Sequence, residues 1–519
     1  MRSNTVQKSS AVRETGFSSE AATTVVFSRK RSEKDSKFEK RAGGFKMSVQ
    51  LTILVGYVIL LSFISWIATR IQRSGKGGAL DYLLAGRHLP TPLVAAMLTG
   101  LAIGGASTVG VAENAYVRGL SAGWYNAAWG AAGILAGLFA AKHFRKMNVR
   151  TVPEMMGRMF GQGARTVGVI AQLLILMVIT ALQYVAGGAI LTALLPDIFT
   201  FQTGMFASAL IFIFITVVGG YWAGGLTNVV NVIVIYVGIF AALHGSSASF
   251  GGWDTIIAAL PAGKPWFDWT SGVGTAVVTA WMVVMITQGF SVQAINQIAF
   301  AAKDEKTARN GFILGGILIL PAGFLCALFG IIAASQFPGL EKPALALPSI
   351  AAHISPLVGG LFLASLWAAD ISTAVGLLLG SSTLIVEDIW KRFFPGTIAP
   401  DREVFVSRMV VLAVSICTFL MALTVRGILV TITTALAITA SFTLLILAGI
   451  YTPGLCKRIA GFWTISASIL VWLAWTFVPA IRVVPHLAYL EWPVCLAVFL
   501  LCAVLGKEPA KSLLVSETA

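Results

Sequence analysis

The sequence predicts an all-α membrane protein with about thirteen transmembrane helices. Of its 519 residues, 57% are hydrophobic and only 11% are charged, and the mean hydropathy is +0.84. A soluble domain carries about 25% charged residues. Apolar runs of about 18 residues or more recur along the chain, each long enough to cross the hydrocarbon core of a bilayer. Such spans must be helical, because backbone groups find no water there.

Charge and cysteine usage exclude several other classes of protein. The formal net charge of +15 is distributed over the loops between spans, which argues against a nucleic-acid partner. HExxH, Walker and GxSxG motifs are missing, and no soluble segment is large enough for an ATPase, so we expect neither an enzyme nor an obligatory protein partner. No disulfide framework is expected, because no CxxC or metal-ligand spacing occurs among Cys326, Cys417, Cys456, Cys495 and Cys502.

The spans follow a polar tail. Residues 1–46 are rich in Ser and Lys, and we expect them to be disordered. The tail does not resemble a signal peptide, because no apolar stretch precedes Met47. We expect the spans near residues 49–71, 91–116, 122–143, 165–195, 203–220, 224–245, 272–300, 308–336, 357–388, 405–425, 428–454, 461–480 and 488–506.

Basic residues are distributed unequally between the loops. One set of loops carries 21 Lys and Arg residues, and the alternate set carries 5. By the positive-inside rule, the C-terminus is cytoplasmic and the Met47 end lies outside a cell (inner) membrane. The tail conflicts with this orientation, because it holds 11 basic and 5 acidic residues. One explanation is that the later loops determine the orientation and the tail is translocated. The other, which we favour, is that the natural start is Met47 and residues 1–46 come from an upstream start codon.

The second span contains a run of glycines and polar residues, LTGLAIGGASTVGVAENAY. Its glycines are Gly100, Gly104, Gly105 and Gly110. Glycine permits close packing of membrane helices, so one interpretation is a packing face. The other is a broken helix whose freed carbonyls line a cavity, as at ion and substrate sites in transporters. The second is favoured by the polar neighbours, which are Thr99, Ser107, Thr108, Glu113 and Asn114.

The seventh span is also polar. Six uncharged polar side chains fall within eleven residues, namely Thr287, Gln288, Ser291, Gln293, Asn296 and Gln297. Polar residues can simply hold helices together, but this density favours the lining of a cavity. The second and seventh spans are five apart, so an inverted repeat of five plus five spans would put each at the first position of its repeat.

The ninth span, SLWAADISTAVGLLLGSSTLIVEDIW, places a carboxylate and two adjacent hydroxyls inside an apolar helix. Ala369, Ser372 and Thr373 fall at i, i+3 and i+4, so they share one helical face. Two hydroxyls, together with freed carbonyls of a neighbouring broken helix, would offer the oxygen ligands that a hard cation such as sodium takes. The alternative is that both hydroxyls hydrogen-bond to their own helix.

Four segments, in order, are similar to those of a known family. DYLLAGRHLP (81–90) resembles the segment that leads into the family's first core helix, and TVPEMMGRMFG (151–161) resembles its signature cytoplasmic loop. AAKDEKTARNGFILGG (301–316) resembles the link between the first two helices of its second repeat, and AADISTAVGLLLGSSTLIVEDIW resembles its sodium-site helix. From about Leu51 to the twelfth span, the chain resembles the sodium:solute symporter family, which has a LeuT-type fold.

The resemblance implies two inverted five-helix repeats, with one helix before them and two after. The expected segments are the basic tail 1–46, a first transmembrane helix and cytoplasmic loop 47–90, the first repeat 91–245, an extracellular loop 246–271, the second repeat 272–454, two C-terminal helices 455–506 and a cytoplasmic tail 507–519.

The resemblance also implies two sets of site residues. Sodium, as a transported ion and not a tightly bound cofactor, would bind the carbonyls of Gly100, Ile103 and Ala369 and the hydroxyls of Ser372 and Thr373. The transported solute would be bound by Ser107, Asn126, Trp129, Gln288 and Gln293.

Four positions depart from the family pattern. Asn228 and Asn231 stand where the family often has an aspartate near the ion's exit route, so an ion site that depends on it is in doubt. Asp370 and Glu113 stand where the family commonly has uncharged residues, and a carboxylate inside the membrane is costly and usually functional. We consider Asp370 as an anion near sodium, a proton carrier, a partner of Arg118 or a group in a watery vestibule. Glu113 has a coupling, substrate or solvated interfacial role.

These features predict a sodium-coupled symporter that imports a small organic solute by alternating access. One alternative is a proton-coupled symporter of the same fold, which Asp370 favours. Another is a transporter-like sensor, which the lack of an output domain disfavours. The expected partners are the lipid bilayer and the solute. The neutral, partly aromatic pocket suggests an organic acid or an amino acid, and Arg118 could help to attract an anion at the outer mouth.

Overall fold

The structure, a computed structural model, describes residues 49, 51–53, 55–68, 70, 79–399, 402–425 and 427–511. The expected disordered tail, the start at Met47 and Arg426 lie outside the described residues. From Gln50 onward the chain forms one unit. Its described residues are helical and include two isolated β-bridges but no sheet, in agreement with the all-α prediction.

Nine helices in the described part of the chain are long and apolar enough to span a membrane, and the bent pair α11–α12 would be a tenth. The exact count of thirteen is therefore not confirmed. The nine are Leu51–Ala68, α8 (Gln162–Leu194), Tyr221–Ser249 within α9, α13–α14 (Glu305–Ile319 and Ala322–Gln336), α16–α17 with the π-turn η4 (Pro356–Thr383, Lys391–Phe393 and Leu384–Trp390), α18 (Glu403–Ala422), α19–α20 (Ile428–Leu436 and Thr439–Tyr451), α21 (Arg458–Phe477) and α22 (Ala488–Leu505).

Three predicted spans take a different form. The spans expected over 203–220 and 224–245 lie on one helix, α9 (Phe201–Ser249). The glycines between them leave the helix uninterrupted, because glycine, unlike proline, keeps its backbone donor. The expected third span is α5 (Trp124–Phe139) followed by the short α6 (Ala141–Lys146).

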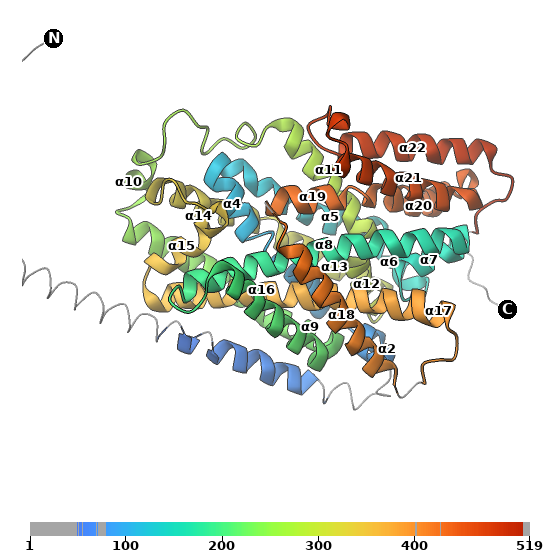
Figure 1. Cartoon of the computed structure of the whole chain (residues 1–519), viewed down its shortest axis with the longest axis horizontal. Coiled ribbons are helices and arrows are strands. Elements are labelled where there is room, and N and C mark those ends of the chain that lie inside the picture. Colours follow the sequence, from blue (N-terminus) through green and yellow to red (C-terminus); the bar gives the residue numbers. More distant parts are fainter. Residues whose placement is uncertain are drawn as a thin grey trace, which may run out of the picture. The chain divides into compact units, whose positions relative to one another are not determined.

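Helices α8, α9 and α16 pack against one another within the unit, and α20, α21 and α22 pack together beside them (Figure 1). Short elements gather at both ends of the long helices. Figure 1 shows α4, α10, α14 and α15 toward one end and α6, α7 and α17 toward the other. The bounds of the elements new here are α4 (Val109–Arg118), α7 (Val152–Phe160), α10 (Trp253–Ala258) and α15 (Ala346–His353).

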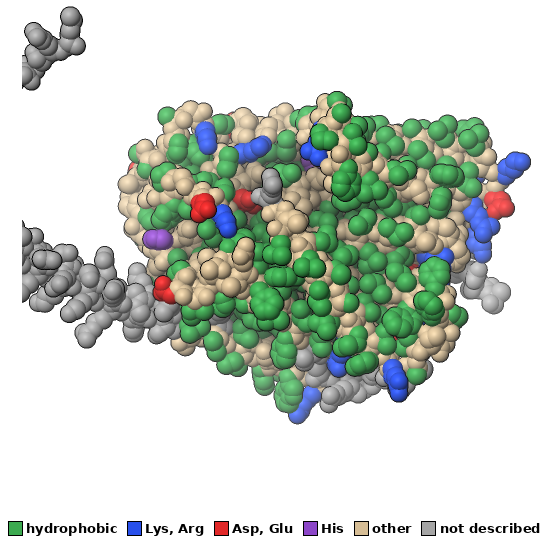
Figure 2. Space-filling model, viewed as in Figure 1, with side chains coloured by type: hydrophobic (Ala, Val, Ile, Leu, Met, Phe, Trp, Pro, Cys, Tyr) green, Lys and Arg blue, Asp and Glu red, His purple; other side chains and the backbone are tan. Residues whose placement is uncertain are grey.

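The surface suits a lipid environment. Hydrophobic side chains cover much of the visible face, and charged side chains gather mainly near its edges (Figure 2). Phe214, Leu470 and Phe477 are 64%, 64% and 75% exposed. Large apolar side chains exposed to this extent, and in this number, mark a surface that meets lipid or a partner.

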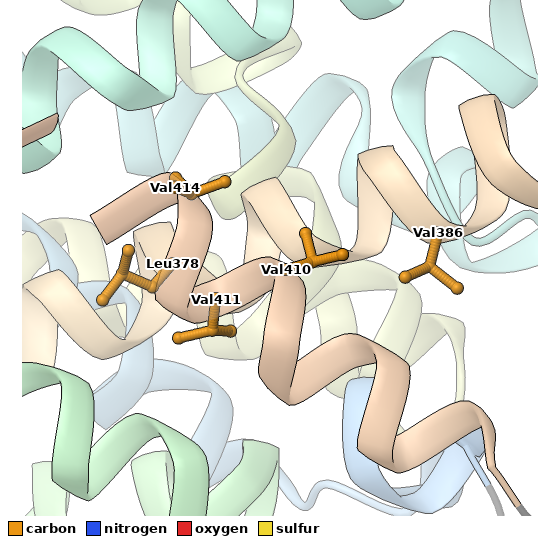
Figure 3. Close-up of a cluster of buried hydrophobic side chains, with 5 residues drawn as sticks. All are labelled: Leu378, Val386, Val410, Val411 and Val414. Carbon is orange, nitrogen blue, oxygen red and sulfur yellow. The ribbon is translucent and has the colours of Figure 1, made fainter. Parts of the chain in front are cut away.

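Helix α16 is enclosed by protein. It packs against α8, α9 and α18, and its most apolar stretch is 89% buried. One wall is an aliphatic cluster that joins it and η4 to α18 (Figure 3), made of Leu378, Val386, Val410, Val411 and Val414. The polar residues of α16 therefore face protein and not lipid, which is where membrane proteins place such groups.

Candidate functional site

The second predicted span is a broken helix. α3 (Thr91–Ala102) and α4 (Val109–Arg118) are separated by residues 103–108. The break frees the Gly105 amide from helical bonding, and the amide donates to Gln183 Oε1 (3.0 Å) and to Asp370 Oδ1 (3.2 Å). Side chains of α8 and α16 thus satisfy backbone groups that would otherwise be buried without partners.

The glycines at the break are also required by packing. A Cβ atom on Gly104 would lie 2.4 Å from Thr373 Oγ1, and one on Gly105 would lie 2.2 Å from Ala186 Cβ. The two interpretations of the glycines in the sequence therefore both hold. The glycines allow the broken segment to lie directly against α8 and α16.

The structure brings the expected sodium ligands into one region. The Thr373 hydroxyl donates to the carbonyls of Gly100 (2.8 Å) and Ala369 (3.0 Å), and the Ser372 hydroxyl donates to Ala369 (2.8 Å). Ile103 is the buried C-cap of α3. Both hydroxyls thus bond to their own helix, as the alternative interpretation held, but Thr373 also reaches across to the broken helix.

The seventh span is bent as well. α11 (Thr275–Ser291) and α12 (Gln293–Ala301) meet at 44° with Val292 between them. Gln172 of α8 bridges this break, since its Nε2 donates to Ser291 O (2.8 Å) and its Oε1 accepts from Gln293 N (3.0 Å). Each broken helix therefore has one α8 glutamine bonded to its freed backbone.

Sequence reasoning missed both α8 glutamines, although a signal was present. Gln172 and Gln183 are eleven residues apart, which is about three helical turns, so they share one face of α8. Both are buried in an apolar helix. Two buried amides on one face of a membrane helix predict backbone partners, because a lone amide in hydrocarbon is costly.

A small cavity of about 30 Å³ adjoins the first break. Water-sized space of this volume holds about two molecules. Of the expected solute ligands, Ser107, Trp129 and Gln288 line it. Thr373, Gln183 and Tyr125 line it too, and Tyr125 lies four residues before Trp129, on the same helical face. Among the residues that the structure describes, no charged side chain lines this cavity.

Two expected solute ligands lie elsewhere. Asn126 is buried against α14, where a Cβ atom on Gly323 would lie 2.7 Å from its own Cβ. Gln293 Oε1 accepts from Val152 N (2.7 Å), at the start of α7. Gln293 is separated from Gln288 for a geometric reason, because even in a straight helix five residues turn the face by about 140°, and the bend adds to this.

Asp370 is fully buried on α16. Its Oδ1 accepts from Gly105 N, and its Oδ2 has no hydrogen-bond partner. Among the residues that the structure describes, no Lys or Arg forms an ion pair with it, so the expected alternatives of a partner in Arg118 and of a watery vestibule are not found. Its position beside the break places it next to the region of the sodium ligands.

The other departures from the family pattern have separate places. Glu113 Oε2 accepts from Ile428 N (3.4 Å) and lines a cavity of about 320 Å³ with Glu341 and Lys342. The Asn228 amide lies against Gly100, where a Cβ atom would come 2.3 Å from Asn228 Oδ1. Asn231 Nδ2 donates to Ala368 O (3.4 Å). Asn231 therefore bonds to the backbone of α16, whereas Asn228 packs against α3 and its Oδ1 has no hydrogen-bond partner among the described residues.

Known proteins with similar sequences are sodium symporters. A sequence profile of the sodium:solute symporter family matches residues 82–466. The chain belongs to this family. It is 24% identical over 387 residues to the sodium/glucose cotransporter of Vibrio parahaemolyticus, covering 68% of this chain and 70% of that protein. It is 27% identical over 360 residues to the sodium/pantothenate symporter of Escherichia coli (strain K12), covering 66% and 72%.

The fold of this sodium:solute symporter family member is LeuT-type. A solved sodium-coupled sialic acid symporter, in a substrate-bound outward-open state, matches with a TM-score of 0.71 at 17% identity, covering 89% of this chain and 99% of that one. The protein is thus a multi-pass, sodium-coupled transporter and not an enzyme, and sodium is its transported ion and not a bound cofactor.

Proposed function

We propose that the protein imports a small organic solute together with sodium by alternating access. Sodium would be held by the carbonyls of Gly100, Ile103 and Ala369 and by the hydroxyls of Ser372 and Thr373. The observation that supports this most strongly is the 2.8 Å approach of Thr373 Oγ1 to Gly100 O at the helix break. An ion there would draw α3 and α16 together, favour the outward-open form and complete the solute site.

The solute would bind among Ser107, Trp129 and Gln288, with Tyr125 and Gln183 as further contacts. Asn126 and Gln293 are not part of this proposal. The cavity of about 30 Å³ is too small for an organic molecule, so the solute would enter only after the helices around it have moved apart. Such gating about a fixed central site is how broken-helix transporters work.

The lining suggests the class of solute. It offers neutral hydrogen-bonding groups and an aromatic ring but no charged side chain. Helix α4, whose N-terminus is the positive end of its dipole, begins at Val109, two residues after Ser107. A half-helix N-terminus of this kind suits a carboxylate, which supports a small organic acid or an amino acid.

We place the protein in the cell inner membrane with its C-terminus in the cytoplasm and the Met47 end outside. The asymmetry of Lys and Arg between the loops supports this orientation. We also retain segments 91–245 and 272–454 as the inverted repeats. The two broken helices α3–α4 and α11–α12 lie at their starts, as first helices of repeats do.

Proton coupling is the second candidate, because Asp370 is a buried carboxylate without a cationic partner. Such a group must be neutralised by a proton or by a nearby cation, since an unpaired charge in the membrane interior is costly. Either event would change the charge of the carboxylate that accepts from the Gly105 amide, and would thereby change the hydrogen bonding at the helix break.

Uptake into vesicles, with sodium and proton gradients imposed separately, tests the proposal. The solute is chosen beforehand by a thermal-shift screen with and without sodium. Sodium-driven uptake is expected, and uptake driven only by protons would favour the second candidate. Asp370→Asn should lower the apparent sodium affinity or make uptake pH-dependent. Unchanged sodium activation and an unchanged pH profile in this variant would remove Asp370 from the coupling scheme.

A further inference from the structure

A second cavity, remote from the helix breaks, is lined by basic side chains. Its volume is about 520 Å³, and its lining consists of Gly86, Arg87, His88, Arg145 and Lys303. Three of these side chains are cationic, and no carboxylate of the described part of the chain lines the cavity. We call it the basic cavity. The basic cavity is formed by segments far apart in the sequence, namely the turn before α3, helix α6 and the loop after α12.

The backbone that forms one wall of the basic cavity is strained. Ala85, Gly86 and Arg87 have φ angles of 48°, 60° and 63°. Only glycine adopts this left-handed conformation without cost, so two of the three residues are held in it by their surroundings. Strain of this kind is common where a ligand is held.

Two of the three cations of the basic cavity, Arg87 and Arg145, donate to backbone carbonyls. Arg145 donates to Ala302 O (2.6 Å) and Lys303 O (3.2 Å). Arg87 Nη2 donates to Val149 O (3.0 Å), and its Nε is buried without any acceptor. Burial and the positive charges of Arg145 and Arg150 lower the pKa of Arg87 to about 10, so the cations repel one another.

Nearby carboxylates are already engaged. Glu154 pairs with Arg158 (2.6 Å), and Asp304 accepts from Thr307 N (2.7 Å) at the start of α13. Glu154 still interacts with the charge of Arg87 and Asp304 with that of Lys303, and Asp81 Oδ1 would lie 2.4 Å from a Cβ atom on Gly86. None of the three carboxylates is among the lining residues, so they offset the positive charge of the basic cavity only in part. Guanidinium and ammonium groups gathered in this way match the charge and the several acceptor oxygens of a phosphate group.

The basic cavity also adjoins a contact between the two broken helices. Leu89 N donates to Ala301 O (3.2 Å), and Lys303 N donates to Leu89 O (2.9 Å). These bonds tie the residues before α3 to those after α12. A ligand between Arg87, Arg145 and Lys303 would reinforce this tie, and it would thereby bias the equilibrium between conformations that keep or break it.

We propose that the basic cavity binds a phosphate-type oxyanion, either the headgroup of an anionic phospholipid or free phosphate, and that this anion clamps the segment before α3 to the segment after α12. Basic pockets beside membrane helices commonly hold lipid headgroups on the cytoplasmic side. That side is where the proposed orientation puts this cavity. The site is distinct from the sodium and solute positions, so its test does not depend on transport.

The experiment measures the thermal midpoint of the full chain in nanodiscs at constant sodium concentration and ionic strength. In one arm, inorganic phosphate replaces chloride in phosphatidylcholine discs. In the other arm, the discs contain equal parts of phosphatidylcholine and phosphatidylglycerol, without phosphate. Lys303→Gln removes one cation of the cavity, Lys303→Arg keeps it, and Lys306→Gln removes an exposed cation three residues away that does not line the cavity.

We expect phosphate, phosphatidylglycerol or both to raise the midpoint of the wild type, and the arm that responds identifies the source of the anion. Lys303→Gln should weaken the response by about fivefold in ligand concentration, which corresponds to one basic residue at an anionic surface. Lys303→Arg and Lys306→Gln should behave as the wild type. Absence of a response in both arms, or equal losses in Lys303→Gln and Lys306→Gln, would overturn the proposal.

Discussion

At the scale of single residues, the site depends on two glycines at the helix break, which have no side chain. Gly104 and Gly105 let the unwound segment touch Thr373 and Ala186, at distances where a Cβ atom would overlap them. The same lack of side chains exposes the Gly105 amide to Gln183 and Asp370. Glycine at this position thus has two effects: the segment lies close to α8 and α16, and its backbone amide is accessible to their side chains.

The first prediction concerns Gly105→Ala. The added Cβ atom would lie 2.2 Å from Ala186 Cβ and 2.6 Å from Asp370 Oδ1, so the segment must shift. We expect a loss of stability of about 1–3 kcal/mol, which is typical of an overpacked interior, and a lower sodium response. Thermal unfolding measures both. Gly454→Ala is the control, because nothing lies within 4 Å of its Cβ position. Equal midpoints for the two variants would contradict the packing argument.

Some of these residue-scale features could be read from the sequence. The spacing of Ala369, Ser372 and Thr373 fixes a common face, because helical periodicity is local. The break could be inferred from glycines mixed with hydroxyl residues. The packing of Asn126 against α14 could not be predicted. It depends on which face of α5 is covered by α14, a segment distant in the sequence.

At the scale of elements, α8 connects the two broken helices. Gln183 bonds to the first break and Gln172 to the second. Because both amides project from one rigid helix, a shift of either break relative to α8 breaks hydrogen bonds that are buried. Helix α8 therefore fixes the positions of both helix breaks through these hydrogen bonds.

The second prediction tests this role with Gln172→Ala. The change leaves Ser291 O and Gln293 N buried without their partner, and each unsatisfied group costs about 1–3 kcal/mol. We expect a clearly lower thermal midpoint and slower uptake. Gln162→Ala, an exposed position on the same helix, should change neither. An unaffected Gln172→Ala protein would mean that α8 does not hold the second break.

A third prediction concerns η4, the π-turn that follows α16. Arg165 Nε lies 2.6 Å from Asp388 Oδ1, and the Asp388 side chain is fully buried whereas that of Arg165 is 19% exposed. Arg165→Met leaves a buried carboxylate unpaired, so we expect a loss of up to about 3 kcal/mol. The double variant with Asp388→Asn should recover most of it. A double-mutant cycle on thermal midpoints measures this coupling.

The control for that cycle is an exposed pair. Arg458 and Glu508 are 60% and 69% exposed, and such pairs contribute about 0–1 kcal/mol. Arg458→Met should therefore have little effect. If Arg165→Met were equally mild, the pair with Asp388 would not fasten η4 to α8.

At the scale of the whole molecule, the LeuT-type fold packs the two broken helices against α8 and α16. Thr373 of α16 contacts the first break, Gln172 of α8 the second, and the Leu89 and Ala302 segments meet beyond them. Movement of one set of helices against the other would therefore change the cavity between them, as alternating access requires.

The family and the helical fold could be predicted because they depend on composition and on four local motifs. The division into spans was less predictable. The boundary expected between the spans 203–220 and 224–245 lies inside α9, which continues through it, because the glycines there keep their backbone donors. The faces that the expected solute residues present could not be predicted, because they depend on the bend at Val292.

The most direct test of the central claim is a sodium titration of the purified protein, with N-methyl-D-glucamine replacing sodium. The thermal midpoint of the wild type should rise with sodium. Thr373→Val, which keeps the shape and removes the hydroxyl, should require roughly tenfold more sodium, because a bond to a charged group contributes about 1.5–3 kcal/mol. Thr180→Val, whose hydroxyl bonds only to Leu176 O, should titrate as the wild type. A Thr373→Val protein with unchanged sodium dependence would contradict the account.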